Sequence, residues 1–180
     1  MKFIVVGLGI QGKKRLALEG DEGVAAVDPV APGANYKTIE EAPSNSYDAA
    51  LVCVPDNVKL SIVEFLLSRG KHVLVEKPML AERADDLLRL KQLASTRKVA
   101  CYTAYNHRFE PHIVSLKGVL ESGGLGRIYI AKFFYGNGTA RDVRNSPWRD
   151  RGMGVLSDLG SHLLDWTLFL FGKPATPPHA

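Results

Sequence analysis

Short apolar runs alternate with amphipathic stretches along the first two thirds of the chain. The apolar runs are KFIVVG at 2–7, GVAAVD at 23–28, AALVCVP at 49–55, HVLVEKP at 72–78 and VACYTAY at 99–105. Such runs are typical of parallel strands that are covered on both faces of a sheet. The spacing of apolar positions over 11–19, 58–69 and 81–96 predicts helices between these strands. The alternation therefore predicts an α/β fold with a doubly wound parallel sheet.

Two regions depart from this rhythm. Residues 29–35 read PVAPGAN, which is too short and too rich in Pro and Gly for a helix and predicts a loop. After residue 111 the pattern predicts a helix over 112–122, a half-buried strand over 127–138, a polar loop over 139–154 and a final apolar helix. We therefore expect a first domain over 1–115 and an incomplete second domain over 116–180.

Composition narrows the classes of function. The chain has 180 residues, 46% of them hydrophobic, and a formal net charge of +4, but its Lys and Arg residues form no stripe with interleaved aromatics. We therefore expect no nucleic-acid partner. The N-terminal apolar run leads into glycines without a cleavage site, and no run approaches the roughly 20 residues that span a bilayer. These features predict a cytoplasmic protein without a membrane partner, in which Cys53 and Cys101 are unpaired core side chains.

The motif GLGIQG at 7–12 follows the first predicted strand and opens a helix. Gly7 permits a tight turn, Gly9 lets the backbone approach a pyrophosphate, and Gly12 allows close packing of the helix. The backbone of Ile10 and Gln11 belongs to the same loop, at a helix N-terminus that favours negative charge. This context predicts a dinucleotide site.

Asp28 stands at the end of the second predicted strand, in the sequence VDP. A carboxylate at this position accepts both ribose hydroxyls and repels a 2′-phosphate, which favours NAD, with NADP as the alternative. A purely structural role, in which Asp28 starts a turn before Pro29, stays open.

The sequence VEKP ends the fourth predicted strand and places Glu76 and Lys77 at the carboxyl edge of the sheet. Ligands of open α/β folds bind at this edge. Lys77 is suited to donate a hydrogen bond to a substrate oxygen or to take part in proton transfer. The alternative is a surface ion pair of little energetic value.

Three ionisable residues interrupt the apolar segment GVLSDLGSHLLDW at 154–166. Asp158, His162 and Asp165 share one face of a helix, beside an apolar face formed by Leu159, Leu163, Trp166 and Leu170. A carboxylate one turn from an imidazole orients it as a general base. Three other roles stay open: helix capping by Ser157 and Asp158, a structural histidine, and a metal site, which we do not expect because no further ligands stand at compatible spacing.

These motifs together resemble the glucose-fructose oxidoreductase, inositol dehydrogenase and MocA-like family of NAD(P)-dependent oxidoreductases. GLGIQG, VDP, VPD, GKHVLVEKP, YNHRFEP, WR and GVLSDLGSHLLD follow one another in that family's order over residues 1–172. The resemblance implies an N-terminal Rossmann domain and a C-terminal α/β substrate domain. It further implies hydride transfer between nicotinamide and a secondary alcohol of a sugar, polyol or nucleotide-linked sugar.

The resemblance also assigns roles to individual residues. Lys77 would contact the reacting oxygen and precede a cis peptide bond to Pro78, His162 would be the acid/base, and Asp158 would lie nearby. Further cofactor contacts are implied for Cys53, Val54, Pro55, Asp56, Glu76 and Asn106, with Trp148 and Arg149 closing over the cofactor.

The chain departs from the family pattern in three places. Lys59 stands where many members have a histidine, the usual helix after the second strand is missing, and most of the second domain's sheet is absent. The strand at 127–136 and the helix at 158–171 would then present uncovered surface, which predicts a homo-oligomer, a partner chain or a fragment of a longer enzyme. The alternative to an enzyme is a catalytically silent dinucleotide-binding or cofactor-sensing module.

Overall fold

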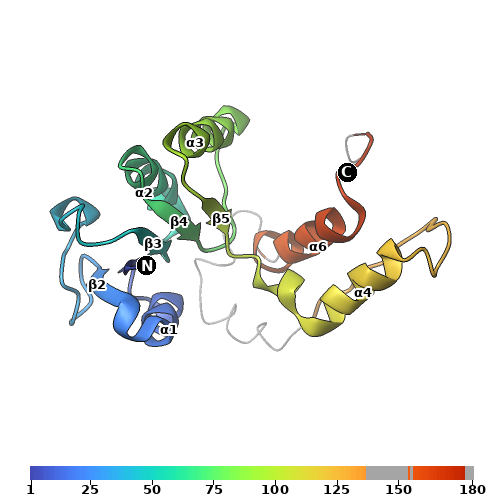
Figure 1. The fold of residues 1–180 in the computed structure, drawn as a ribbon, viewed down its shortest axis with the longest axis horizontal. Coiled ribbons are helices and arrows are strands. Elements are labelled where there is room, and N and C mark those ends of the chain that lie inside the picture. Colours follow the sequence, from blue (N-terminus) through green and yellow to red (C-terminus); the bar gives the residue numbers. More distant parts are fainter. Residues whose placement is uncertain (137–153, 155, 177–180) are drawn as a thin grey trace. The chain divides into compact units, whose positions relative to one another are not determined.

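The computed structural model describes residues 1–136, 154 and 156–176. The chain divides into two compact units, Met1–Ala104 and Tyr105–Ala180 (Figure 1). The domain boundary expected at residue 115 stays a prediction. No helix among the described residues is long and apolar enough to cross a membrane.

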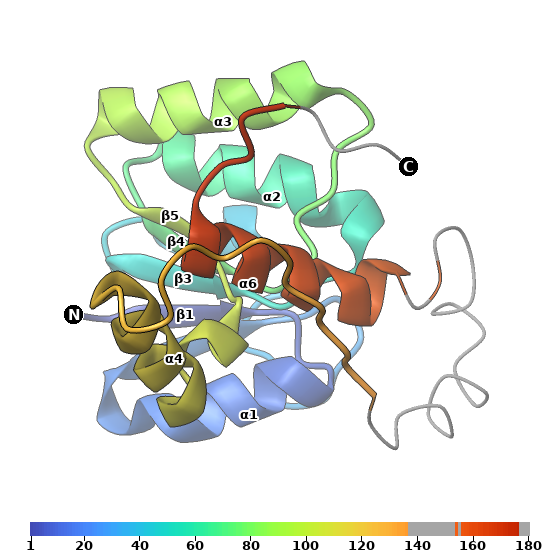
Figure 2. The ribbon, with the colours of Figure 1, turned by 90° about the vertical axis from the view of Figure 1, so that its right-hand side faces the viewer.

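The first unit contains a parallel sheet of five strands, as the apolar runs predicted. The strands are β1 (Phe3–Val6), β2 (Gly23–Val27), β3 (Ala49–Val52), β4 (His72–Val75) and β5 (Cys101–Thr103), in the spatial order β2-β1-β3-β4-β5. The helices are α1 (Ile10–Glu19), α2 (Asp56–Ser68) and α3 (Ala84–Arg97), with short 3-10 turns η1 (Gly20–Glu22) and η2 (Ile39–Glu41). Figure 2 shows α2 and α3 on one face of this sheet and α1 on the other.

Side chains of the central strands point alternately into two apolar layers, one on each face of the sheet. Ile4 and Val6 of β1 belong to the larger layer, which includes Val63, Leu66 and Leu67 of α2. Val5 faces the smaller layer, whose other buried members are Leu8, Ala26 and Leu51. Each large aliphatic side chain that is fully buried in this way stabilises the fold by about 1.5–3 kcal/mol. The double coverage explains why the strands read as continuous apolar runs.

The connection after β2 contains no helix, as expected from its Pro and Gly content. Ala31 and Ala34 of this loop pack on the smaller apolar layer. The Asn35 side-chain oxygen accepts a hydrogen bond from the Ala26 N–H at 2.8 Å, and Tyr36 forms a parallel bridge with Val27. The loop therefore covers the outer edge of β2 and carries the chain back toward the sheet.

The described part of the second unit is helical. It contains η3 (Asn106–Phe109), α4 (Pro111–Glu121), a π-helical turn η4 (Leu156–Gly160) and α6 (Ser161–Phe171). The strand expected over 127–138 is wrong for residues 127–136, which form no strand and are mostly exposed. An extended segment needs a hydrogen-bonded neighbour to become a stable strand, and the described residues offer none here.

Candidate functional site

In the glycine loop after β1, two glycines are packed closely against backbone atoms and a third has open space beside it. A Cβ on Gly7, whose φ is +92°, would lie 2.5 Å from the Cys53 carbonyl oxygen, and a Cβ on Gly12 would overlap the Gly7 carbonyl. A Cβ on Gly9 would meet no atom within 4 Å. Gly9 is also the N-cap of α1, so the open side exposes the positive end of a helix. This is the geometry that a pyrophosphate requires.

Ile10 and Gln11 form the first turn of α1 and are exposed beside this open side. Ile10 is 73% exposed. The loop therefore presents backbone donors together with an apolar surface to solvent.

Asp28 is held by main-chain donors from two directions. Its Oδ2 accepts from the Leu8 N–H at 2.8 Å, and its Oδ1 accepts from the Val30 and Ala31 N–H groups at 2.9 and 2.8 Å. Partial burial alone would raise the pKa of the Asp28 carboxyl, but these three hydrogen bonds and the charge of Lys13 hold it below its usual value.

The two roles considered for Asp28 coincide in this geometry. The carboxylate organises the turn after β2 and also stands beside the glycine loop, through its bond to Leu8. A carboxylate has about four acceptor sites, and three of them are filled by the main chain. We expected Asp28 to accept both ribose hydroxyls, whereas the geometry leaves room for about one such bond.

The turn after β3 comprises Cys53, Val54, Pro55 and Asp56, and α2 begins at Asp56. The Cys53 N–H donates to the Val6 carbonyl at 2.7 Å, which aligns this turn with the glycine loop. Burial, helped by the nearby Glu76 carboxylate, raises the pKa of the Cys53 thiol to about 12. The thiol is therefore neutral, so this turn offers backbone groups and the Asp56 carboxylate rather than a thiolate.

The turn after β4 carries Glu76, Lys77 and Pro78. The Glu76 N–H donates to the Val52 carbonyl at 2.8 Å, and the Lys77–Pro78 peptide bond is cis, which confirms the expectation from the resemblance. Arg15 of α1 donates to Glu76 Oε1 through Nε at 3.1 Å and through Nη2 at 2.7 Å. Among the described residues both bonds end on Oε1, so Oε2 can accept a hydrogen bond from a ligand.

Lys59 was noted in the sequence only as a departure from the family pattern. Its residue exposure is 2%, and its ammonium donates to Asp56 Oδ1 at 2.6 Å and to the Pro78 carbonyl at 2.7 Å. Sequence reasoning missed this link, and it missed the contact of Arg15 with Glu76. The three-residue spacing of Asp56 and Lys59 on a helix was the one available signal.

In the second unit, His162 lies inside a cluster of rings. It is 3% exposed, and its ring centroid lies 4.3 Å from that of His107, 5.8 Å from that of Tyr105 and 6.1 Å from that of Tyr135. His107 Nδ1 contacts Glu110, and its Nε2 pairs with the Tyr135 hydroxyl at 3.1 Å. Asn106 begins η3, immediately before His107. The cluster brings a buried imidazole beside a carboxylate–imidazole–phenol chain.

Asp165, which we placed on one helix face with Asp158 and His162, is paired with a cation of another element. Asp165 is 6% exposed and forms a two-point ion pair with Arg108, in which Arg108 Nε donates to Oδ2 at 3.0 Å. A buried carboxylate needs such a partner to stay charged. Asp165 therefore fastens α6 to η3.

The expected capping role is wrong for α6. The N-cap of this helix is Gly160, which makes no side-chain cap hydrogen bond, and the Ser157 hydroxyl donates to the Gly154 carbonyl at 2.9 Å. Asp158 lies half-buried in the π-helical turn, four residues before His162. The wider π-helical turn changes the angle between these two side chains from that of an α-helix.

The predicted residues thus fall into two groups. Gly7, Gly9, Ile10, Gln11, Gly12, Asp28, Cys53–Asp56, Glu76 and Lys77 belong to the first unit, along the carboxyl edge of its sheet. Asn106, Asp158 and His162 belong to the second unit. Trp148 and Arg149 lie outside the described residues. No group of three or more His, Cys, Asp or Glu side chains within 1–136, 154 and 156–176 is arranged to hold a metal ion.

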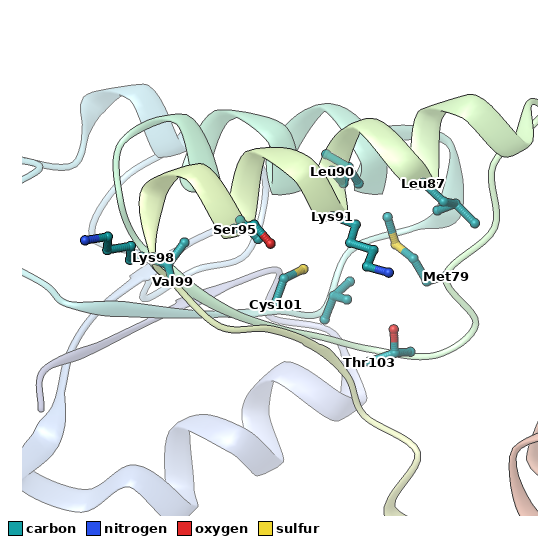
Figure 3. Close-up of a pocket in the computed structure, with 11 residues that line it drawn as sticks. Met79, Leu87, Leu90, Lys91, Ser95, Lys98, Val99, Cys101 and Thr103 are labelled. Carbon is teal, nitrogen blue, oxygen red and sulfur yellow. The ribbon is translucent and has the colours of Figure 1, made fainter. Parts of the chain in front are cut away.

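The first unit also has a hollow between α3 and the strands β4 and β5, with a volume of about 390 Å³ (Figure 3). Met79, Leu87, Leu90, Lys91, Cys101 and Thr103 are among its lining residues. None of the residues predicted to bind cofactor or to move a proton lines this hollow.

The sheet order, the glycine loop with its open side and the acid at the end of β2 define a Rossmann dinucleotide-binding domain. The comparison with protein families agrees: the chain belongs to the GFO/IDH/MocA oxidoreductase family with the NAD-binding Rossmann fold, whose model matches residues 1–105. The model of the GFO/IDH/MocA C-terminal domain matches residues 113–177.

Several relatives are named as dehydrogenases. The chain is 28% identical to an inositol 2-dehydrogenase of Rhizobium meliloti (strain 1021), over 96% of the chain and 56% of that protein. It is 31% identical to scyllo-inositol 2-dehydrogenase (NADP(+)) IolW of Bacillus subtilis (strain 168), over 71% of the chain and 36% of that protein. The chain spans between about a third and somewhat over half of the length of such relatives.

A solved structure agrees with the fold over most of the chain. The WlbA (WbpB) dehydrogenase of Thermus thermophilus, solved in complex with NAD and UDP-GlcNAcA, has a TM-score of 0.73 and 22% identity. The alignment covers 98% of this chain and 64% of that protein. At this identity the likeness shows the fold alone.

Proposed function

We propose that this chain is the cofactor-binding and catalytic part of an NAD-dependent oxidoreductase. Its substrate would be a secondary alcohol, or the corresponding ketone, of a sugar, polyol or nucleotide-linked sugar. One observation carries the proposal. Backbone atoms block the Cβ positions of Gly7 and Gly12, whereas the space beside Gly9, which lies between them, is open to a ligand. Family membership and the inositol dehydrogenases among the relatives support the substrate class.

The first unit would hold the cofactor along the carboxyl edge of its sheet. Main-chain donors at the N-terminus of α1 would bind the pyrophosphate, and Asp28 would accept about one ribose hydroxyl. The lowered pKa of Asp28 keeps its charge at neutral pH, and this charge repels a 2′-phosphate, which supports NAD over NADP. The bound nicotinamide supplies a carbon that accepts or donates a hydride.

The chain's own residues would manage the proton of the substrate hydroxyl. During oxidation, a ring nitrogen of His162 would take the proton of the substrate hydroxyl. The Lys77 ammonium would donate a hydrogen bond to the substrate oxygen and stabilise its developing negative charge. Asp158, one turn before His162, would orient the imidazole and the substrate. Reduction of the ketone uses these groups in reverse.

The test is steady-state absorbance of reduced nicotinamide with a panel of inositols, hexoses and nucleotide-linked sugars. We expect His162→Ala and Lys77→Ala each to lower kcat by about 10²-fold or more, in the range measured for general acid–base groups. His112→Ala and Lys71→Ala are the matched controls, because His112 has a 70% exposed side chain and Lys71 binds the Tyr47 carbonyl instead of a site residue. Rates that are undiminished in both site variants would refute the proposed roles.

A catalytically silent module is not favoured, since the chain belongs to an oxidoreductase family and several relatives are named as dehydrogenases. Calorimetry separates the two functions. Tight binding of NAD by a chain that oxidises no member of the panel would support the silent module, whereas turnover would exclude it.

A further inference from the structure

Two cations from different helices bind the residues on either side of Lys77. Arg15 of α1 donates twice to the Glu76 carboxylate, at 3.1 and 2.7 Å. Lys59 of α2 donates to the Pro78 carbonyl at 2.7 Å. Because α1 and α2 cover opposite faces of the sheet (Figure 2), the turn at residues 76–78 is held from both faces.

The position of Lys59 is electrostatically unfavourable in itself. Its side chain is 3% exposed and stands in the first turn of α2, at the positive end of the helix. The Asp56 carboxylate, at 2.6 Å, and the Pro78 carbonyl compensate for the burial of the ammonium. Such pairs add little net stability compared with an apolar side chain of similar size, and solvent weakens this one further because the Asp56 side chain is 52% exposed. Their clear effect is geometric, because they fix two segments at a defined separation.

Arg15 fixes the other end of the turn. The side chains of Arg15 and Glu76 are 26% and 16% exposed, so solvent weakens this charge-assisted pair only in part. The Glu76 N–H is bonded to the Val52 carbonyl at 2.8 Å, which ties the same residue to the sheet. Lys77 thus follows a residue that is fixed by main chain and side chain, and precedes a residue whose carbonyl is fixed by Lys59.

We propose that Arg15 and Lys59 are positioning residues that hold the turn at 76–78 and thereby set the place of Lys77. The inference rests on the proposed function for the catalytic role of Lys77. Neither Arg15 nor Lys59 touches substrate in this proposal. Misplacement of a reacting group by about 1 Å can lower a rate by about 10²-fold, so the two cations would act on turnover through the turn alone.

The first measurement is independent of activity. Hydrogen exchange of the full chain without cofactor, followed by mass spectrometry over residues 76–80, is compared among Lys59→Met, Arg15→Gln and the unaltered protein. Each variant removes one hold on the turn, so we expect amide exchange in this segment to become about tenfold faster or more. Unchanged exchange in both variants would overturn the proposal, whatever the rates show.

Two matched controls carry the same substitutions elsewhere in the first unit. Lys71→Met removes an ammonium that donates to the Tyr47 carbonyl at 2.8 Å, just before the start of β4. Arg89→Gln removes a guanidinium that pairs with Glu64. Both controls should leave exchange over 76–80 within about twofold of the unaltered protein, since local opening free energies are largely independent between separate regions.

The second measurement is kinetic. Both variants should lower kcat by about tenfold to 10²-fold. KM for NAD should rise by a smaller factor, because Glu76 or Asp56 then loses one partner as a proposed cofactor contact, while the glycine loop that would hold the pyrophosphate keeps its own bonds. Arg15→Lys keeps the charge and should recover most of the rate. A merely structural defect would instead lower the melting temperature without this split. Equal losses in Arg15→Lys and Arg15→Gln would contradict the role of the ion pair.

The two measurements separate failure of this inference from failure of the proposed function. Suppose that Lys77→Ala leaves turnover unchanged but amide exchange over 76–80 is faster in Lys59→Met and Arg15→Gln. The proposed function then fails, while the inference that the two cations hold the turn stands. If Lys77→Ala abolishes turnover and amide exchange over 76–80 is unchanged in Lys59→Met and Arg15→Gln, the inference fails and the proposed function stands. If Lys59→Met does not fold by circular dichroism, the Arg15 variants decide, because the Arg15 side chain is more exposed than that of Lys59.

Discussion

Substitution of Gly12 by alanine should disrupt the packing of α1 against the glycine loop and lower the stability of the protein, instead of stabilising the helix. At an ordinary helix position this change adds about 1 kcal/mol of stability. Here the new Cβ would lie 2.8 Å from the Gly7 carbonyl carbon and would overlap its oxygen, whereas real Cβ atoms stay beyond 3.0 Å. Backbone cannot rotate away as a side-chain tip can. Overpacking costs about 1–3 kcal/mol and occasionally more. Because the obstacle here is backbone, we take the upper end of this range, and after the gain of about 1 kcal/mol we expect a net loss of about 2 kcal/mol or more.

Gly9→Ala is the matched variant, because its Cβ would meet no atom within 4 Å and its φ of −66° suits any residue. We expect this variant to melt like the unaltered protein and to lose the response to NAD, since the methyl group occupies the approach of the pyrophosphate.

Thermal unfolding by circular dichroism, with and without NAD, measures both effects. A ligand at about 100 times its Kd stabilises the native state by about 2.7 kcal/mol, so the unaltered protein should show a clear rise in Tm. Gly12→Ala should start from a lower Tm and also lack the rise. The reasoning is refuted if Gly12→Ala melts like the unaltered protein, or if Gly9→Ala keeps the full response to NAD.

Two further predictions concern buried or hydrogen-bonded carboxylates. Arg108→Met leaves Asp165, which is 6% exposed, without its cation and should cost about 3–5 kcal/mol of stability, measured as faster amide exchange along α6. The double variant Arg108→Met/Asp165→Leu should recover most of this loss. Amide protection in Arg108→Met equal to that of the unaltered protein would contradict the role of the pair. Asp28→Asn places a donor against the Leu8 N–H and should cost about 1 kcal/mol at pH 7 in urea unfolding. Because folding lowers the pKa of Asp28, the advantage of the unaltered protein should be full above the ordinary pKa of 3.8 and should shrink as the pH falls through the lowered value; a difference that does not change with pH would contradict this account.

The sheet could be predicted from sequence because its central strands β1, β3 and β4 are largely buried on both faces. Each strand of the structure lies inside one of the five apolar runs, and the strand ends then place Asp28, Glu76 and Lys77 at one edge. The absence of a helix after β2 could also be predicted from sequence, because residues 29–35 are too short and too rich in Pro and Gly to form one. The cis bond before Pro78 followed from the family resemblance, not from any local pattern.

Other features depend on contacts that sequence spacing does not reveal. Arg15 and Glu76 are 61 positions apart, and Arg108 and Asp165 are 57 apart, so neither pair could be matched before the fold was known. Without the Arg108 contact, Asp165 was recognisable only as a carboxylate on the same predicted helix face as His162. The alternation over 127–136 misled for a similar reason, because a period of two indicates a strand only where a neighbouring strand exists.

The two borders of the sheet differ in how readily another chain can extend it. At β2 the main-chain groups of Ala26 are already bonded to the loop, through the Asn35 side chain and through the N–H groups of Asn35 and Tyr36. In the sheet of the described residues β5 pairs with β4 alone, and its Tyr102 is 42% exposed. A strand of three residues offers few groups for intermolecular pairing, which limits the risk of aggregation. Of these two borders, β5 is nevertheless the one at which edge-to-edge association would start at high concentration, and a charged residue in place of Tyr102 would protect against it.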